Sequence, residues 1–210
     1  MQHDLANQLR PACATHPRAG RHRSRRASSA ARAGQRDPTW LGLDHPAALG
    51  DAVAHLADAA ARVFVLAGDN GRGVAQQFVV DLGALRDDVF VLDGNEIAVR
   101  RQIALLRPTD VLVTLDFRRY ERWLVGAAVD AARAGVWAVT VTDSLLSPLA
   151  AHAQRAFVVA AAGAGPFDSH IGTLAVFNVL VTGVADQLRA VATERLDRLE
   201  AVWQRALTDR

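Results

Sequence analysis

The chain has 210 residues, of which 50% are hydrophobic and 22% are charged, and this length and composition exclude a largely disordered protein and leave little room for two full domains. Its formal net charge of +2 is unevenly spread, because residues 1–40 hold eight arginines against Asp4 and Asp37 and so carry +6, leaving −4 for the rest. A basic patch confined to one end is no argument that the remaining chain binds nucleic acid.

Residues 1–40 are predicted to form a disordered, arginine-rich tail, and residues 41–210 a single folded domain. The tail is built from Arg, Ala, Ser and Pro without apolar residues at helical or strand spacing, so it cannot bury enough surface to offset chain entropy. Its arginines are typical either of a solvated tail or of an arm that binds DNA. Cys13 is the only cysteine, which excludes an intrachain disulfide and a thiolate metal cluster and favours a reducing, cytoplasmic setting.

From Pro46 the pattern becomes helical, and a lead-in helix is predicted there because apolar residues recur at helical spacing. Short β-branched runs then alternate with helical stretches. The predicted strands are 63–66, 89–92, 111–115, 137–141 and 156–159, and the predicted helices between them are 74–85, 97–106 and 120–134. This alternation predicts an α/β fold, a flavodoxin-like doubly wound, three-layer αβα sandwich with a five-stranded parallel sheet.

Two further helices are predicted to close the chain. The first, from about 169 to 188, is apolar, but its longest stretch without Asp, Glu or Arg falls short of the roughly 20 residues that cross a membrane, so it is interpreted as a buried helix. No membrane segment and no export signal are predicted. The second is amphipathic, and its apolar face is expected to cover a neighbour; that face holds Leu196, Leu199, Trp203 and Leu207.

Ligands of open parallel sheets bind beyond the carboxyl ends of the strands, so the segments after the strands are the candidate site. The first is the glycine-rich turn 68–73, where the backbone can turn tightly and expose amides to a phosphate, although a purely structural turn fits equally well. It is neither a dinucleotide fingerprint nor a P-loop, since the chain has no lysine. Its candidate ligand-binding residues are Gly68, Asn70, Gly71 and Arg72.

Arg118 and Arg119 follow the central strand and are the second candidate segment. A guanidinium group can grip phosphate or carboxylate with two parallel hydrogen bonds. The alternative is a pair of surface arginines that is solvated or paired with Glu121.

Hydroxyl-bearing segments follow the last two strands. Their side chains can donate to a ligand, but short polar residues before a helix are as readily explained as caps. Asp143 and Ser147 are possible caps after the fourth predicted strand, and Asp168 or Ser169 is interpreted first as the N-cap of the apolar helix. The candidate ligand-binding residues in these segments are Thr142, Asp143, Ser144, Ser147 and Ser169.

No catalytic residue, cofactor or metal is predicted. A general base that moves a proton between sugar carbons is typically Glu or His, and the candidates are His170, His152 and Glu96, none of which has an evident acid partner. The seven histidines include no pair at ligand spacing beside a Cys or carboxylate.

The order of several segments is recognisable as a family pattern. The most specific are Asp110–Val113 leading to Asp116–Tyr120, Ala134–Gly135, Thr140–Ser144 and Ser147–Ala150. With them, the run from 63 to 185 resembles a SIS (sugar isomerase) domain, especially that of RpiR/MurR-type bacterial transcription regulators. The resemblance implies a five-stranded parallel sheet, a homodimer, and a site that senses phosphorylated sugars to alter operator binding by an N-terminal helix-turn-helix domain.

The sequence departs from that family in two places. Serines or threonines that typically follow the first and central strands are replaced by Gly71 and by Arg118-Arg119-Tyr120, which permits a phosphorylated sugar, a different small anion or a lost site. No helix-turn-helix pattern is visible, so DNA contact is expected only through a domain not evident in this chain. The predicted function is a phosphosugar-binding sensor domain of an RpiR-type regulator; the alternatives are an aldose–ketose isomerase and a structural dimerisation domain that has lost its ligand.

Overall fold

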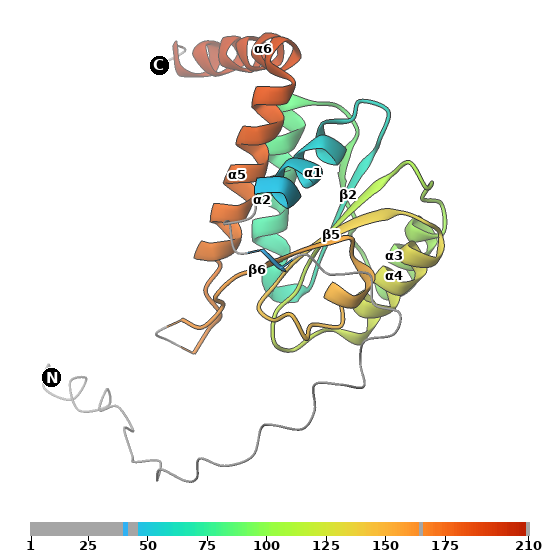
Figure 1. The fold of residues 1–210 in the computed structure, drawn as a ribbon. Helices are drawn as coiled ribbons and strands as arrows, with labels where there is room; N and C mark the ends of the chain where they lie inside the picture. Colours follow the sequence, from blue (N-terminus) through green and yellow to red (C-terminus); the bar gives the residue numbers. More distant parts are fainter. Residues whose placement is uncertain (1–39, 42–45, 164–165, 209–210) are drawn as a thin grey trace, which may run out of the picture. The chain divides into compact units, whose positions relative to one another are not determined.

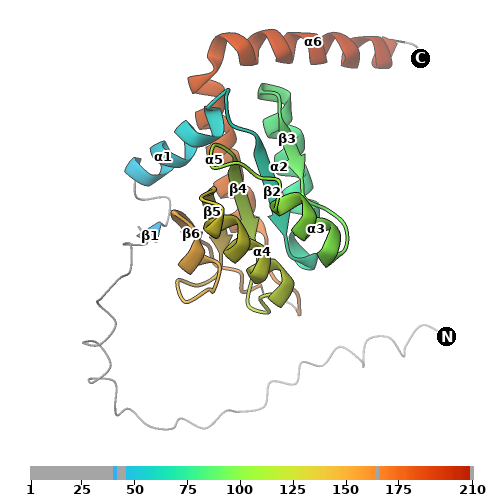
Figure 2. The same cartoon turned by 90° about the vertical axis from the view of Figure 1, so that its right-hand side faces the viewer.

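The computed structural model describes residues 40–41, 46–163 and 166–208. Within these residues, the strands form one parallel sheet in the order β1-β6-β5-β4-β2-β3 (Figure 1 and, with every strand labelled, Figure 2). The strands are β1 (Trp40–Leu41), β2 (Val63–Ala67), β3 (Val89–Val91), β4 (Val111–Leu115), β5 (Trp137–Thr142) and β6 (Arg155–Val158). The helices are α1 (Pro46–Ala57), α2 (Arg72–Leu85), α3 (Glu96–Ile103), α4 (Arg122–Arg133), α5 (Ile171–Gln187) and α6 (Arg189–Thr208), with short 3₁₀ turns η1 (Asp69–Gly71) and η2 (Ala150–His152).

Helices cover both faces of the sheet. Alternate residues of each strand point to opposite faces, so Val111, Val113 and Leu115 of β4 pack with α1, α2 and α5, whereas Leu112 packs with α3 and α4. Figure 1 shows these two helical layers on either side of the sheet. The burial of β4 on both faces explains its continuous apolar run and confirms the predicted three-layer αβα sandwich.

The five predicted strands are all present, and each agrees with the prediction to within one residue at either end. The sheet also contains a sixth strand, β1, in which Trp40 pairs with Ala156. A strand of two residues offers no alternation for a sequence pattern to detect, and Trp40 was counted with the tail. Residues 1–39, for which a disordered tail is predicted, lie outside the described residues.

Helix α3 is shorter than predicted. It ends at Ile103, and the amides of Leu105 and Leu106 bond three residues back, to Gln102 and Ile103, in a tighter turn. Leu106 is nevertheless buried in the core beneath α3, which is why the apolar pattern continued beyond the helix.

Helix α6 is anchored near its start. Ala192 is buried, and the Arg195 guanidinium donates to the carbonyls of Gly83, Ala84 and Arg86 at the end of α2. Beyond this anchor the predicted apolar face is exposed, and Figure 2 shows the helix extending away from α5. The expectation that this face covers a neighbour is therefore not met within one chain.

No single described helix is both long and apolar enough to cross a membrane. By length and composition alone, α5 and α6 taken together are long and apolar enough, and the two helices meet at a bend of 109°.

Candidate functional site

The sheet reverses its order between β2 and β4, because β3 is added on one side of β2 and β4 on the other. The register pairs Ala67 with Leu115 and Leu115 with Val141, so the residues after β2, β4 and β5 leave the sheet at one edge. We call the loops at this edge, residues 68–72, 116–121 and 142–147, the crevice loops. The predicted ligand segments after these three strands are thus brought together by the fold.

The first crevice loop turns at Gly68, whose backbone is buried. A Cβ atom built on Gly68 would lie 2.6 Å from Asp116 Oδ1 and 3.0 Å from Glu121 Oε1, so only glycine fits here. Its N–H donates to the Leu115 carbonyl at 2.9 Å, which holds this loop against the end of β4. The requirement for glycine therefore comes from the close approach of two carboxylates.

The next two predicted ligand residues of this loop differ in their exposure. Asn70 is exposed within η1, where its side chain is free to meet a ligand from solvent. Gly71 is buried, and a Cβ atom there would lie 2.8 Å from Leu115 Cδ2. Gly71 therefore serves the packing of this loop on β4.

Asp116 is the buried centre of the second crevice loop. Its Oδ1 accepts the N–H of Phe117 at 2.9 Å and its Oδ2 accepts the N–H of Glu121 at 2.8 Å. Burial, with smaller contributions from the nearby Glu121 and Asp143 carboxylates, raises the pKa of Asp116 to about 6 despite these two hydrogen bonds. Asp116 thus organises this loop while carrying an unfavourable buried charge at neutral pH.

Arg118 is held by groups from two other segments. Its N–H donates to Asp143 Oδ1 at 3.1 Å, and its guanidinium pairs with Asp168, which precedes α5. Its φ of 42° is unusual for a residue with a side chain, and such strain is common at functional sites. Arg119 is exposed on the same loop. The alternative pairing of these arginines with Glu121 is not what the structure shows, because Glu121 contacts the first crevice loop instead.

The third crevice loop contributes Asp143 to the site. Asp143 accepts the Tyr120 hydroxyl at 2.8 Å, and burial, together with this hydrogen bond, raises the pKa of Tyr120. Thr142 and Ser147 are buried beside that hydroxyl. Ser144 is half-buried, and its Oγ accepts the Leu146 amide at 3.1 Å.

The predicted caps are partly wrong. Ser147 Oγ accepts the Leu149 amide at 3.3 Å within a turn, but Asp143 caps no helix because Arg118 and Tyr120 engage it. Neither Asp168 nor Ser169 is the N-cap of α5, because His170 holds that position. Asp168 pairs with Arg118, and Ser169 Oγ accepts the Ile171 amide at 3.4 Å.

The candidate general bases lie in different settings. The His170 ring is 5.3 Å from the Phe117 ring, and its buried Nδ1 has no hydrogen-bond partner. Glu96 is exposed at the start of α3 and pairs with Arg100 at 2.9 Å, whereas His152 lies in η2. Of the three, only His170 lies against a crevice loop.

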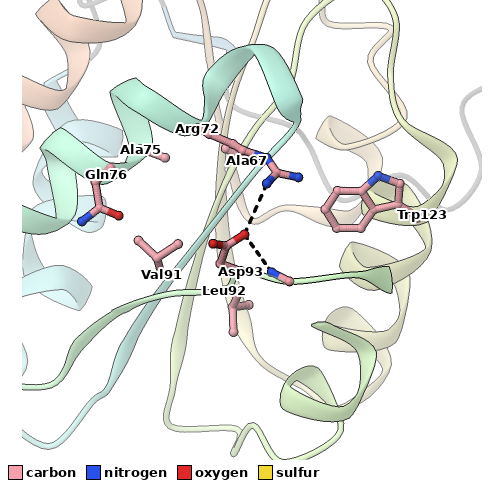
Figure 3. Close-up of a pocket in the computed structure, with 9 residues that line it drawn as sticks. Ala67, Arg72, Ala75, Gln76, Val91, Leu92, Asp93 and Trp123 are labelled. Atoms are coloured by element: carbon pink, nitrogen blue, oxygen red, sulfur yellow. Dashed lines mark hydrogen bonds and ion pairs between the residues drawn. The ribbon is translucent and has the colours of Figure 1, made fainter. Parts of the chain in front are cut away.

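A small cavity of about 60 Å³ lies on the β3 side of the first crevice loop (Figure 3). Arg72 extends into it and makes a long contact of 3.4 Å with Asp93, opposite the indole of Trp123. Apolar residues, including Ala75 and Val91, complete its lining. Arg72 therefore lines this cavity, and its acidic partner there follows β3.

Sequence reasoning missed the part played by Glu121 and Trp123. Glu121 Oε1 accepts the Asp69 amide at 2.5 Å, and the Trp123 indole N–H donates to its other oxygen. The signal available in the sequence was the number of acidic residues in the segments after the strands. The crevice loops hold four carboxylates and three guanidinium groups, and Asp168 before α5 adds a further carboxylate. The carboxylates of the loops are Asp69, Asp116, Glu121 and Asp143, and the guanidinium groups are those of Arg72, Arg118 and Arg119.

Among the residues that the structure describes, no group of three or more His, Cys, Asp or Glu side chains could hold a metal ion. The crevice carboxylates are instead satisfied by amides, a phenol, an indole and a guanidinium.

The family model described as SIS domain matches residues 55–183, which include all three crevice loops. The chain belongs to the SIS domain family. The solved structure of the sugar isomerase domain of the RpiR transcription factor from Sphaerobacter thermophilus is 31% identical to this chain, with a TM-score of 0.67, and the match covers 75% of this chain and 87% of that one. The family assignment made from the sequence is thereby confirmed. No curated protein matches this SIS domain significantly.

Two more distant structures share the fold of this SIS domain. The Vibrio vulnificus NanR protein complexed with ManNAc-6P is 16% identical with a TM-score of 0.67, covering 79% of this chain and 63% of that one. The E. coli CFT073 protein c3406, also solved in a complex, is 17% identical with a TM-score of 0.57, covering 70% of this chain and 81% of that one. The fold is therefore shared by proteins of low sequence identity to this chain.

Proposed function

We propose that this SIS domain is a sensor that binds a phosphorylated sugar at the crevice loops and does not convert it. The observation that carries the proposal is Arg118, held in a strained backbone conformation at the sheet's switch point by Asp143 and Asp168. Similarity to an RpiR transcription factor supports a regulatory role, and a relative of the same fold was solved with ManNAc-6P. Arg118 and Arg119 supply the positive charge that a phosphate needs.

Replacing both arginines with alanine is expected to weaken sugar-phosphate binding by about 100-fold or more, because two charge-assisted contacts are lost. Binding is measured by calorimetry and thermal shift against a panel of sugar phosphates, each matched with the unphosphorylated sugar. Circular dichroism checks the fold, and Arg133→Ala on exposed α4 surface is the matched control. Undiminished affinity in the double variant would place the site elsewhere.

The isomerase alternative is favoured by one observation, the buried His170 Nδ1 without a partner beside Phe117. A neutral imidazole nitrogen of this kind can accept a proton. Prolonged incubation of the chain with each sugar phosphate that binds, followed by NMR, separates the two functions, since only an enzyme forms the isomeric sugar. The third candidate, a structural domain that has lost its ligand, is favoured by the carboxylates that occupy the crevice, and it predicts no response to any sugar in the panel.

We propose further that the domain acts as a homodimer in the cytoplasm, and that α6 contacts a second copy. Leu199, Trp203 and Leu207 are exposed on α6, and Trp203 keeps 64% of its surface accessible. Apolar surface gathered on one helix commonly marks a protein–protein interface. Any effect on operator DNA would pass from this dimer to a helix-turn-helix domain that is not evident in this chain.

Trp203→Asp is therefore expected to convert a dimer into a monomer, as measured by light scattering after size-exclusion chromatography, with little change in the fold. Leu146→Asp is the control, because Leu146 is 91% exposed on a crevice loop and not on α6. If the Trp203 variant stays dimeric while Ile171→Asp dissociates, the interface lies at the start of α5 instead.

A further inference from the structure

Glu121 lies where the first two crevice loops meet, and both of its carboxylate oxygens are engaged. One accepts the Asp69 amide at 2.5 Å and the other accepts the indole N–H of Trp123. The backbone of Glu121 is fixed as well, because its N–H donates to Asp116. Two contacts thus hold the carboxylate in place, and a third fixes the backbone that carries it.

The Asp69 amide, which donates to Glu121, is of the kind that binds phosphate in parallel α/β folds. Asp69 follows the end of β2, and its N–H belongs to the turn that leads through η1 into α2. An anion at such a position gains from the exposed amide and from the helix dipole. In this chain a side-chain carboxylate fills that position.

The space around this amide also disfavours a second anion. Asp116 and Glu121 approach the Gly68 backbone so closely that a methyl group would not fit between them. A phosphate group arriving there would meet two carboxylates at short range, and like charges in a partly buried site repel strongly. Arg72 of the first crevice loop pairs with Asp69 and Asp93 on the β3 side, so the positive partners that remain are the arginines of the second crevice loop.

We propose that Glu121 is a specificity-determining residue that sets how strongly this site binds phosphate. Its carboxylate occupies the Asp69 amide, and a phosphate group can use that amide only after Glu121 has left it. In the native chain the phosphate is confined to Arg118 and Arg119. The inference rests on the proposed function, since it assigns a role within the same crevice.

The test compares native chain with Glu121→Gln and Glu121→Ala. Gln keeps the shape and a hydrogen-bond acceptor but removes the charge, whereas Ala also frees the Asp69 amide. Affinity for inorganic phosphate and for each sugar phosphate is expected to rise about tenfold in the Glu121→Gln variant and further in the Glu121→Ala variant, because a repelling charge is removed from the site. Affinity for unphosphorylated sugars is expected to stay unchanged, which a merely structural role would not produce.

Two further variants serve as comparisons for the Glu121 substitutions. Trp123→Phe removes the indole donor and keeps an aromatic ring, so it loosens Glu121 without altering charge and is expected to give a smaller gain in phosphate affinity. Glu194→Gln makes the same chemical change on exposed α6 surface and is expected to alter nothing. Hydrogen exchange at the Asp69 amide, which should quicken in Glu121→Ala, reports loss of the contact independently of any ligand.

The outcomes separate the inference from the proposed function. If the native chain binds a sugar phosphate and the Glu121 variants bind it equally or more weakly, the inference is overturned and the proposed function stands. If the Glu121 variants gain affinity for inorganic phosphate while the native chain binds no sugar phosphate, the inference is supported and the proposed function is overturned. If neither native chain nor any variant binds phosphate in any form, the freed amide is not an anion site and both proposals fall.

Discussion

The Asp116 carboxylate is expected to make the native chain more stable as the pH falls from 7 to 5, by about 1 kcal/mol of unfolding free energy. Burial raises the pKa of Asp116 to about 6, from 3.8 in the unfolded chain. The folded state therefore binds the proton more readily than the unfolded state, and stability from this group rises as pH falls through 6. The full contribution is about 3 kcal/mol and is reached below the unfolded pKa.

The measurement is the difference between native chain and Asp116→Asn in urea unfolding at pH 5, 6 and 7. Taking the difference removes the histidines and other carboxylates that titrate in both proteins. The Asp116→Asn variant is expected to lose the pH dependence. Its amide group cannot accept both the Phe117 and Glu121 N–H groups, so part of the unfolding free energy gained by removing the charge is lost. Asp69→Asn, an exposed change on the neighbouring loop, is the control. Parallel pH curves for native chain and Asp116→Asn would show that Asp116 is not desolvated as described.

Arg86→Met is expected to lower the free energy of unfolding by about 3–5 kcal/mol, the largest loss anticipated for a single substitution in this chain. Arg86 is 6% exposed, and its guanidinium donates to the carbonyls of Leu56 at 2.5 Å, Asp58 at 2.8 Å and Ala61. These carbonyls lie at the end of α1 and in the turn into β2, where no helical amide reaches them. Met fills the space but leaves the Leu56 and Ala61 carbonyls without the guanidinium donors, whereas the Asp58 carbonyl keeps the Ala61 amide at 3.1 Å.

Urea unfolding measures this loss, and Arg101→Met serves as the matched control because Arg101 is exposed on α3. An exposed substitution of this kind changes stability by no more than about 0.5 kcal/mol. Arg86→Lys is expected to recover only part of the loss, since one ammonium cannot reproduce the fork of the guanidinium. A loss below about 1 kcal/mol in Arg86→Met would show that water replaces the guanidinium donors.

Arg86 also shows where a sequence pattern stops being informative. It follows α2 directly and resembles any basic residue at a helix end, which is usually solvated. Its burial depends on the turn between α1 and β2, some 25 to 30 residues earlier in the chain. No local spacing records that contact.

The sequence by itself determined the α/β class, five strands to within a residue, the two helical layers and the SIS family, because strand and helix periods and the order of segments are local properties that burial imposes on each element. It also predicted which loops form the crevice, since carboxyl ends of parallel strands must share one edge.

Only the tertiary structure decided what each polar side chain in those loops contacts. Glu121 and Asp69 are 52 residues apart, Arg118 and Asp168 are 50 apart, and neither pair has any signature in spacing. Carboxylates and arginines were both visible in the sequence, but hydrogen bonding is directional and acts over about 3 Å, so their partners depend on the packing of the completed sheet.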